Sequence, residues 1–333
     1  MNKLKLILFT LLLFILLNAI IVFLWPIRTN LKFADFNPYS EEYSKSLNLN
    51  QDEVLNLYLE TWQRERLFEY DQYTGIRESE SVNGKYVNIS KKNGRLVPNN
   101  PEFCKKNIFF YGGEVVFGYD VTDSQSIPFY FRNILKNKNL EHCVYNYGRA
   151  TYFSTQENIL FQQHLINNKI NKDDLIIFID GDNEIGVNEI LNTKFIEENY
   201  NSLHQKYWKL YKVGIKHFFN LLPINQLYEV FFEKNKNPKI SDQKIDSVSI
   251  LNVYTNNLNI RSAICEKYNF NCYNFLIFND EKMKNNFQQI KKNKNLFYLN
   301  SQEKNLLKNK FNSYSPDSNK ILADEIYYII SIN

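Results

Sequence analysis

The five consecutive apolar residues at 175–179 constrain the fold of this chain more than any other feature of its sequence. A short run without a polar side chain predicts a strand buried on both faces, as in a parallel sheet enclosed between helices. Similar short strands are predicted at residues 108–111, 143–147 and 272–278. The chain is therefore expected to fold around a parallel sheet.

Segments with a helical spacing of apolar residues alternate with the predicted strands. They lie at residues 127–135, 155–166, 250–268 and 319–330. Proline is well tolerated in the first turn of a helix, and Pro128 occupies that place in the first segment. Strands that alternate with helices fold into a layered structure with helices on both faces of the sheet. We therefore predict a three-layer α/β/α domain with a central parallel sheet.

The N-terminus carries an apolar run at residues 6–25, interrupted only by Thr10 and Asn18. This run is long enough to span the hydrocarbon core of a membrane, and it lacks the small-residue cleavage site of a secretory signal peptide. It is therefore predicted to be an uncleaved signal-anchor, a single N-terminal transmembrane helix. Lys3 and Lys5 favour a cytoplasmic N-terminus. This orientation places the bulk of the chain outside the cytoplasm, on the periplasmic or extracellular side.

The chain divides into three predicted parts. They are a membrane anchor at 1–27, a linker with a helix and a small β element at 28–106, and the α/β domain at 107–333, with an aromatic helical insertion at about 195–250. In the middle part, Asn50 and Glu53 resemble a capping box and predict the start of a helix. Asn83-Gly84 predicts a tight hairpin turn between short strands at 81–82 and 85–87.

The net charge is +4, and acidic and basic side chains are mixed along the chain without a long basic block. Domains that bind nucleic acid usually carry a basic patch or stripe. Nucleic acid is therefore not an expected partner. The sequence also lacks a Cys-x-x-Cys pair or a histidine cluster that would suggest zinc, so neither a metal nor a cofactor is expected.

The four cysteines permit two disulfides. Cys104 and Cys143 lie next to two predicted strands that should be neighbours in the sheet, and Cys265 and Cys272 lie seven residues apart around a helix-to-strand turn. Disulfides would form in an oxidising compartment, which agrees with an extracytoplasmic domain. Four buried free thiols are the alternative.

Four segments, in this order along the chain, resemble the sequence blocks of the SGNH/GDSL hydrolases. They are residues 109–118, 146–148, 180–184 and 312–316. The resemblance covers about residues 107–330, and it is strongest to the membrane-anchored relatives found with cell-envelope polysaccharide genes. It implies the flavodoxin-like fold of this family.

The resemblance also implies where the family's active site would lie. In the family, a serine after the first strand attacks an ester, a histidine acts as its base and an aspartate orients the histidine. The nucleophile position is Glu114, the base position is Ser315 and the position of the orienting acid is Asn312. Gly148 and Asn183 match the oxyanion-hole positions.

The three substitutions argue against the family's ester hydrolysis. A carboxylate at Glu114 offers no hydroxyl, and no histidine follows His217, so the tail cannot supply the usual base. Members of a catalytic triad act as a unit, and here all three have changed. We therefore predict a catalytically degenerate protein that binds or scaffolds cell-envelope glycan. Glu114 would either fill the former oxyanion site, held by Gly148 N–H and the Asn183 amide, or point into solvent.

Three other interpretations are retained. The chain could be an active esterase or acyltransferase on envelope polysaccharide, although Ser154 and Ser315 have no base that the sequence reveals. Glu114 could pair with another acid for general acid–base work on a glycan, or bind a divalent cation with it. The acids available for this are Asp180, Asp182 and Glu184. The aromatic insertion could instead make the chain a membrane assembly subunit.

Two further expectations complete the prediction. His142, before the second strand, and His164, on a helix, should be structural histidines. The expected partners are membrane lipid, through the N-terminal helix, and a glycan or an envelope protein.

Overall fold

The computed structural model of this chain contains two compact units, 1–37 with 190–245 and 38–189 with 246–333. Nearly all described residues belong to the second, the α/β unit. The described residues are 5, 9–10, 12–20, 39–62, 68–71, 73–78, 80–149, 152–167, 169–181, 184, 247–277, 287, 295–299, 306–308 and 313–332.

Only a small part of the first unit is described. Residues 12–20 are helical, whereas much of the expected anchor at 6–25 and most of the expected insertion lie outside the described residues. Among the helices of the described residues, none has both the length and the apolar character needed to cross a membrane.

The described residues form an eight-stranded sheet with a parallel centre. Its parallel strands are β6 (Lys106–Gly112), β7 (His142–Asn146), β8 (Leu175–Gly181), β9 (Asn271–Ile277) and β10 (Leu296–Leu299). They are arranged in the order β10-β9-β8-β6-β7, which is the flavodoxin-like order. β8 lies at the centre and all seven of its residues are buried, which confirms the prediction from its apolar run.

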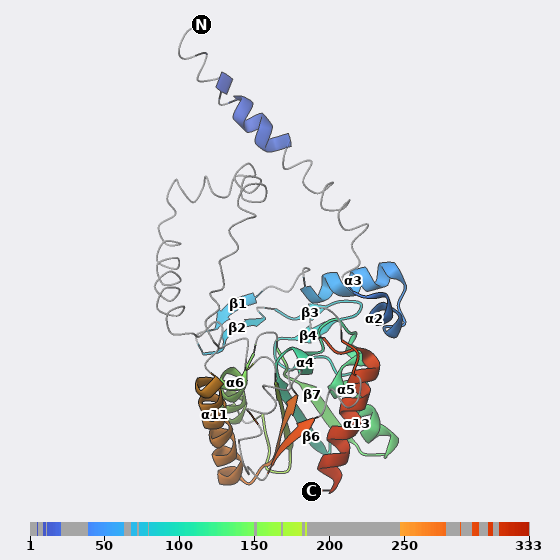
Figure 1. Cartoon of the computed structure of the whole chain (residues 1–333), viewed down its shortest axis with the longest axis vertical. Coiled ribbons are helices and arrows are strands. Elements are labelled where there is room, and N and C mark those ends of the chain that lie inside the picture. The colour runs from blue at the N-terminus through green and yellow to red at the C-terminus, as the bar shows by residue number, and fades with distance from the viewer. Residues whose placement is uncertain are drawn as a thin grey trace. The chain divides into compact units, whose positions relative to one another are not determined.

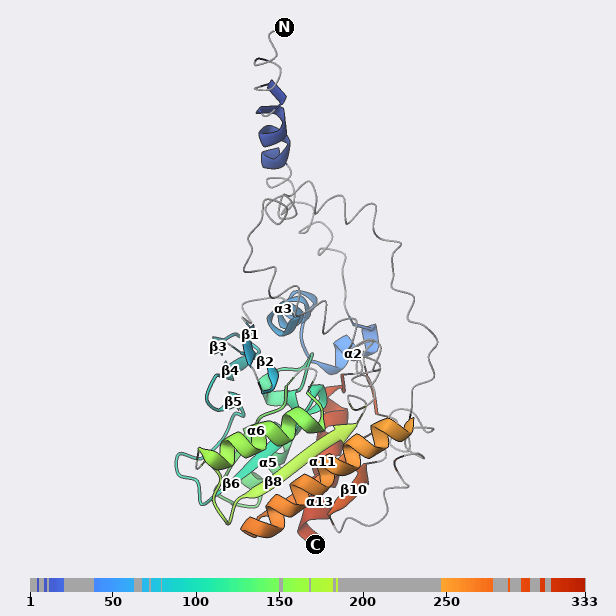
Figure 2. The same cartoon turned by 90° about the vertical axis from the view of Figure 1, so that its left-hand side faces the viewer.

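Helices cover both faces of this sheet (Figures 1 and 2). On one side lie α5 (Ile127–Asn137) and α13 (Pro316–Ile332), and on the other lie α6 (Ser154–Ile166) and α11 (Ser247–Tyr268). Side chains alternate along a strand, so Phe110 of β6 joins the core under α5 and α13 while Phe109 joins the core under α6. The predicted three-layer α/β/α architecture is therefore confirmed, with α13 beginning three residues earlier than predicted.

The capping box expected at Asn50 is present at the start of α3 (Gln51–Trp62). Glu53 N–H donates to Asn50 Oδ1 at 3.0 Å, and Asn50 N–H donates to Glu53 Oε2 at 3.2 Å. The backbone N–H of each of these two residues is thus satisfied by the side chain of the other.

The small β element differs from its prediction in two ways. β3 (Val82–Asn83), β4 (Asn88–Ser90) and β5 (Gly94–Arg95) are antiparallel, and β5 pairs with β7, so the element extends the main sheet. The expected strand at 85–87 is wrong, because these residues form the loop between β3 and β4. The carboxylate of Glu60 on α3 accepts all three of their backbone N–H groups, at 2.8–3.0 Å. Those donors are therefore not available to a strand.

Some elements had no counterpart in the prediction. They are α2 (Glu41–Ser46), β1 (Phe68–Asp71), β2 (Gly75–Glu78) and β10. Residues 39–49 were expected to be linker, yet Tyr43 and Leu47 are buried in a core shared with Phe117 and Val121. The apolar faces of these side chains explain why the segment folds onto the domain.

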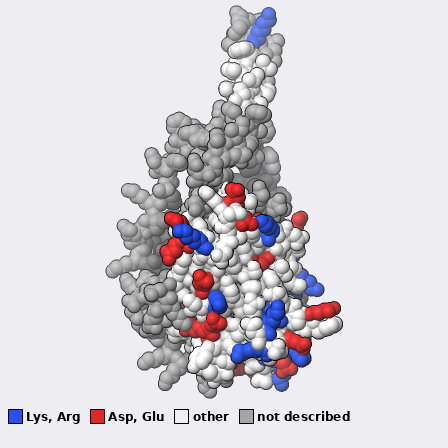
Figure 3. All heavy atoms as spheres, turned by 90° about the vertical axis from the view of Figure 1, so that its right-hand side faces the viewer, with Lys and Arg blue, Asp and Glu red and all other residues white. Residues whose placement is uncertain are grey.

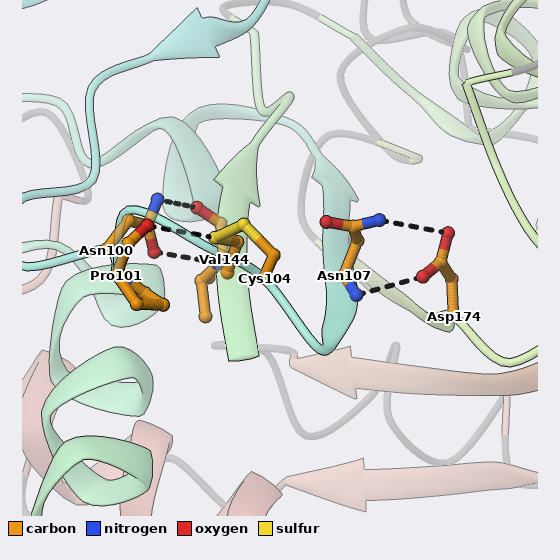
Figure 4. Close-up of a disulfide and its surroundings, with 7 residues drawn as sticks. Asn100, Pro101, Cys104, Asn107, Val144 and Asp174 are labelled. Carbon is orange, nitrogen blue, oxygen red and sulfur yellow. Dashed lines mark hydrogen bonds between the residues drawn. A yellow bond between two sulfur atoms is a disulfide. The ribbon is translucent and has the colours of Figure 1, made fainter. Parts of the chain in front are cut away.

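Both disulfides that the spacing permitted are formed, Cys104–Cys143 and Cys265–Cys272. Figure 4 shows Cys104 beside Asn100, whose side chain accepts from the N–H of Val144 at 2.8 Å and donates to its C=O at 2.9 Å. The bond and these hydrogen bonds together hold the segment before β6 against β7. The same figure shows Asp174 accepting from the backbone N–H of Asn107 at 2.9 Å.

Removal of the disulfides should destabilise the domain unequally. The Cys104–Cys143 bond closes a loop of 39 residues and the Cys265–Cys272 bond a loop of 7. Because the entropy removed from the unfolded chain grows with loop length, the paired serine variants should lose about 4 and about 2 kcal/mol of unfolding free energy, respectively. Guanidinium unfolding, with and without reductant, measures both losses. Equal losses for the two pairs would contradict this explanation.

Candidate functional site

A cavity of about 160 Å³ lies at the carboxyl ends of the parallel strands. Ligands of open α/β sheets bind outside this edge, where the strand order reverses between β6 and β8. Its walls come from the end of β6, from α6, from the ends of β8 and β9 and from the tail before α13. The lining residues are Gly113, Glu114, Val115, Glu157, Ile179, Asp180, Gly181, Glu184, Ile277, Ser313 and Tyr314.

The nucleophile position lies at this cavity. β6 leads through Gly112 and Gly113 into the short helix α4 (Glu114–Phe117). A Cβ atom at Gly112 would lie only 2.6 Å from the backbone oxygen of Ile179, so the close approach of the turn to β8 requires glycine. Glu114 is half-buried and lines the cavity. At the position that the resemblance matches to the family's nucleophile, the cavity therefore holds a carboxylate instead of a hydroxyl.

Gly148, the first oxyanion position, is engaged inside the fold and does not line the cavity. Its N–H donates to Asn146 Oδ1 at 2.9 Å, and Asn146 Nδ2 donates to the carbonyls of Val116 and Phe117. The hypothesis that the Gly148 N–H holds the Glu114 carboxylate is not supported, because Asn146 already accepts that hydrogen. Asn183, the second oxyanion position, lies outside the described residues.

The base position serves α13 instead of the cavity. Ser315 is fully buried, and its Oγ accepts the N–H of Ser318 at 3.3 Å, as an N-cap side chain does. The same Oγ donates to Ser318 Oγ at 3.0 Å. Asn312, the position of the orienting acid, lies outside the described residues.

Ser313 and Tyr314 are the tail residues that line the cavity, and Ser313 carries the hydroxyl of a serine there. Its Oγ donates to Asp120 Oδ2 at 2.8 Å, and Tyr39 donates to Asp120 Oδ1 at 2.6 Å. Burial and the neighbouring Asp120 carboxylate raise the pKa of Tyr39, so its hydroxyl remains a donor. Tyr43 also donates to the carbonyl of Tyr314, at 3.2 Å. The segment before α3 is thereby fixed to the cavity wall.

A buried ionic cluster lies behind the opposite wall. Arg261 of α11 is fully buried and contacts Asp180 at 2.5 Å and Glu157 at 2.9 Å. It also donates to Asn158 Oδ1 at 2.6 Å, and its guanidinium lies 4.0 Å from the ring centroid of Phe178. One cation thus joins β8, α6 and α11 directly behind the cavity.

Glu184 extends the cluster. It accepts the N–H of Ser154 at 2.6 Å and the Oγ–H of Ser154 at 2.8 Å. Asn257 Nδ2 donates to the same Ser154 Oγ at 2.8 Å, and Tyr254 donates to Asp180 Oδ2 at 3.0 Å. Every member of this network is buried.

The three carboxylates, Asp180, Glu157 and Glu184, face a single guanidinium, so the cluster would carry excess negative charge if all were ionised. Burial, and next the charge of Asp180, raise the pKa of Glu184 to about 8. The same two causes raise the pKa of Glu157 well above its ordinary value. Glu184 therefore retains its proton near neutral pH, and the cavity wall is less negative than its composition indicates.

His142 and His164 are not among the residues that line the cavity. Tyr111 Oη and His164 Nδ1 share a hydrogen bond of 2.7 Å, and burial lowers the pKa of His164 to about 3. His164 also lies 4.2 Å from the Tyr147 ring, between centroids. His142 is the first residue of β7, at the other end of the strand from the cavity. Their structural placement agrees with the expectation from the sequence.

Sequence reasoning identified Asp180 and Glu184 but missed Arg261 and Tyr254, which complete their environment. The available signal was an arginine in the middle of a helix next to a buried strand, a position that requires acidic partners. Within the part of the chain that the structure describes, no group of histidine, cysteine and acidic side chains is arranged to hold a metal ion.

No protein-family model matches this chain, and no curated protein matches it. Among solved structures, it is similar to the esterase EstA from Pseudoalteromonas sp., with 11% identity, a TM-score of 0.41 and coverage of 68% of this chain and 97% of the other. It is also similar to a protein assigned to the G-D-S-L family of lipolytic proteins from Desulfitobacterium hafniense, with 11% identity, a TM-score of 0.36 and coverage of 69% and 100%. A lipase from a goat rumen metagenome gives 11% identity, a TM-score of 0.36 and coverage of 66% and 97%.

Glu184→Gln should weaken the dependence of stability on pH. The folded protein holds a proton on Glu184 up to about pH 8, whereas an unfolded glutamate loses it near pH ~4.3. This contribution to stability is complete below the unfolded pKa and is lost as pH rises through the folded pKa. The wild-type unfolding free energy should therefore fall between about pH 5 and about pH 8, by up to about 1.4 kcal/mol per pH unit for each proton.

Urea unfolding at a series of pH values measures this slope. The Glu184→Gln variant should show a shallower fall, because its amide cannot ionise. Glu102→Gln, at an exposed glutamate outside the cavity, provides the matched control and should retain the wild-type slope. Parallel profiles for wild type and Glu184→Gln would show that this carboxyl holds no extra proton.

Proposed function

We propose that this chain is a catalytically degenerate SGNH/GDSL-like protein that binds cell-envelope glycan and does not hydrolyse esters. The observation that carries the proposal is the chemistry at the family's positions. Glu114 lines the cavity where a nucleophilic hydroxyl would be needed, and Ser315 is used as the cap of α13. A carboxylate at the first position and a capping hydroxyl at the other leave the acyl-transfer reaction without its nucleophile or its base.

The active-enzyme alternative would need a different serine. Ser154 does have a carboxylate partner, Glu184, but it is fully buried and does not line the cavity. Ser313 lines the cavity, but its Oγ–H is donated to Asp120, which also accepts from Tyr39. Within the described residues, neither serine is hydrogen-bonded to an imidazole that could carry the proton to a leaving group. These contacts favour the binding interpretation.

The cavity chemistry favours a neutral, hydroxyl-rich ligand. A carboxylate accepts hydrogen bonds from hydroxyl groups, and Glu114 lines the cavity. The same carboxylate would repel a phosphate or a carboxylate on the ligand. Apolar patches at Ile179 and Ile277 offer contact to the carbon face of a sugar ring. A neutral sugar unit of a glycan satisfies both conditions.

The proposal includes a single-pass anchor at residues 6–25 and an extracytoplasmic domain. The apolar run and the lysines before it support this placement. The Cys104–Cys143 and Cys265–Cys272 bonds add support, because disulfides persist in oxidising compartments. On the face drawn in Figure 3, acidic and basic side chains are interspersed, in keeping with a partner other than nucleic acid.

The purified chain should hydrolyse aryl acetates no faster than its Glu114→Ala variant. The physical reason is the absence of a base-activated hydroxyl at the cavity. Stopped assays of p-nitrophenyl acetate, repeated after a second purification step, measure the rate. Activity that survives purification and disappears in Ser154→Ala or Ser313→Ala would overturn the degenerate interpretation and identify the nucleophile.

Retention on immobilised neutral envelope polysaccharide should depend on Glu114. The Glu114→Ala variant should bind about tenfold more weakly, the loss that corresponds to one hydrogen bond of about 1.4 kcal/mol to a charged group. Affinity electrophoresis with the same glycan in the gel measures the change in Kd. Glu102→Ala keeps the matched loss of charge outside the cavity and should bind as wild type does. Equal retention of both variants would exclude Glu114 from a binding role.

A further inference from the structure

Arg132, on α5, is buried without a hydrogen-bond partner. The residue is 4% exposed, and its Nε and Nη1 atoms are both buried and unpaired. Burial lowers the pKa of this guanidinium, as expected for a charge without a counter-ion. A guanidinium has five N–H donors in a fixed fork, so leaving two nitrogens unsatisfied is unfavourable.

Arg95 and Arg261, the other buried arginines of the described residues, show how a guanidinium is satisfied in this domain. Arg95 contacts Asp123 at 2.8 Å and donates to the carbonyls of Phe117, Gly118 and Val121. Arg261 has two acidic partners, as described above. Among the described residues, no acidic side chain and no carbonyl oxygen is hydrogen-bonded to Arg132 Nε or Nη1, unlike the guanidinium groups of Arg95 and Arg261.

Basic side chains lie at the start of β7, the strand that packs against α5. His142, at the start of β7, is half-buried, and burial together with Lys106, Arg132 and Lys105 lowers its pKa. Lys106 and His142 are paired in register on adjacent strands. The acidic group found next to them is exposed Glu141, which is bound to Lys105 at 2.7 Å. This corner of the domain therefore combines an unpaired guanidinium with the basic side chains of Lys105, Lys106 and His142.

We propose that Arg132 and His142 form a binding site for a small oxyanion, a phosphate or a carboxylate group, at the corner where α5 meets the start of β7. The planar fork of arginine matches two oxygens of such a group, and charge-assisted bonds of this type are among the strongest in proteins. Lys106 adds attraction without occupying the fork. The site lies at the start of β7, away from the cavity at the carboxyl ends of the strands, and it does not depend on the proposed glycan-binding function.

Thermal unfolding in different anions tests this site. Sodium phosphate, sodium acetate and sodium chloride are compared at equal ionic strength, with wild type and Arg132→Met. At about ten times its Kd, a bound anion should raise Tm by about 3 °C in a chain of this size. Phosphate, acetate or both should raise the wild-type Tm above its value in chloride. The salt that raises it shows whether the site binds a phosphate or a carboxylate group. Arg132→Met should show no such rise.

Two controls keep the test decisive. Arg77→Met removes an exposed arginine, ion-paired with Glu69, and should keep the full anion-dependent rise. Arg132→Lys keeps the charge but not the fork, so its rise should be reduced, and this variant serves if Arg132→Met does not fold. Equal rises in wild type and in either Arg132 variant would overturn the proposal, and so would a wild-type Tm that is the same in all three salts.

Discussion

The guanidinium of Arg261 is the interaction on which the cavity side of this domain depends. It reaches from α11 to Asp180 on β8 and Glu157 on α6, so one residue joins the central strand to both helices of that layer. A buried ion pair gives little net stability compared with apolar packing of equal volume. A buried charge that has lost its partner, however, is strongly destabilising. The main effect of the Arg261 contacts is therefore to fix α11 next to Asp180 and Glu157, and their contribution to the stability of the fold is smaller. Because Asp180 and Glu157 also line the cavity, the shape of the cavity depends on the same contact.

A second set of interactions holds the other wall. Asp120 is buried and binds Tyr39 from the N-terminal segment and Ser313 from the tail. Arg95 of β5 lies under the same turn, where it joins Asp123 to the backbone around Phe117. These contacts bring together three stretches that are far apart in the sequence. The elements before β6 thus belong to the site, since they support the residues that line it.

The sequence predicted what depends on local pattern and missed what depends on distant partners. The apolar run of β8, the alternation of strands and helices and the capping box at Asn50 are all visible in short windows, and each is present in the structure. The loop at 85–87 was misread as a strand because its backbone donors are taken by Glu60, 25 to 27 residues away. The role of Arg261 was missed for the same reason, since Asp180 lies 81 residues from it. Resemblance placed Glu114 at the cavity but could not show that Gly148 N–H is bound by Asn146.

The contacts of the matched positions bear on whether a catalytic triad could be built in this cavity. If Glu114 were the only departure from the family's pattern, one substitution could complete the site. Here the neighbouring groups have other uses: Ser315 caps α13, and Asn146 both satisfies Gly148 and supports α4. A histidine at 315 would have to replace a fully buried capping hydroxyl, which would cost the cap and require space in the core. The local structure around Ser315 and Gly148 therefore does not favour a catalytic triad at this cavity, which agrees with the binding role proposed for Glu114.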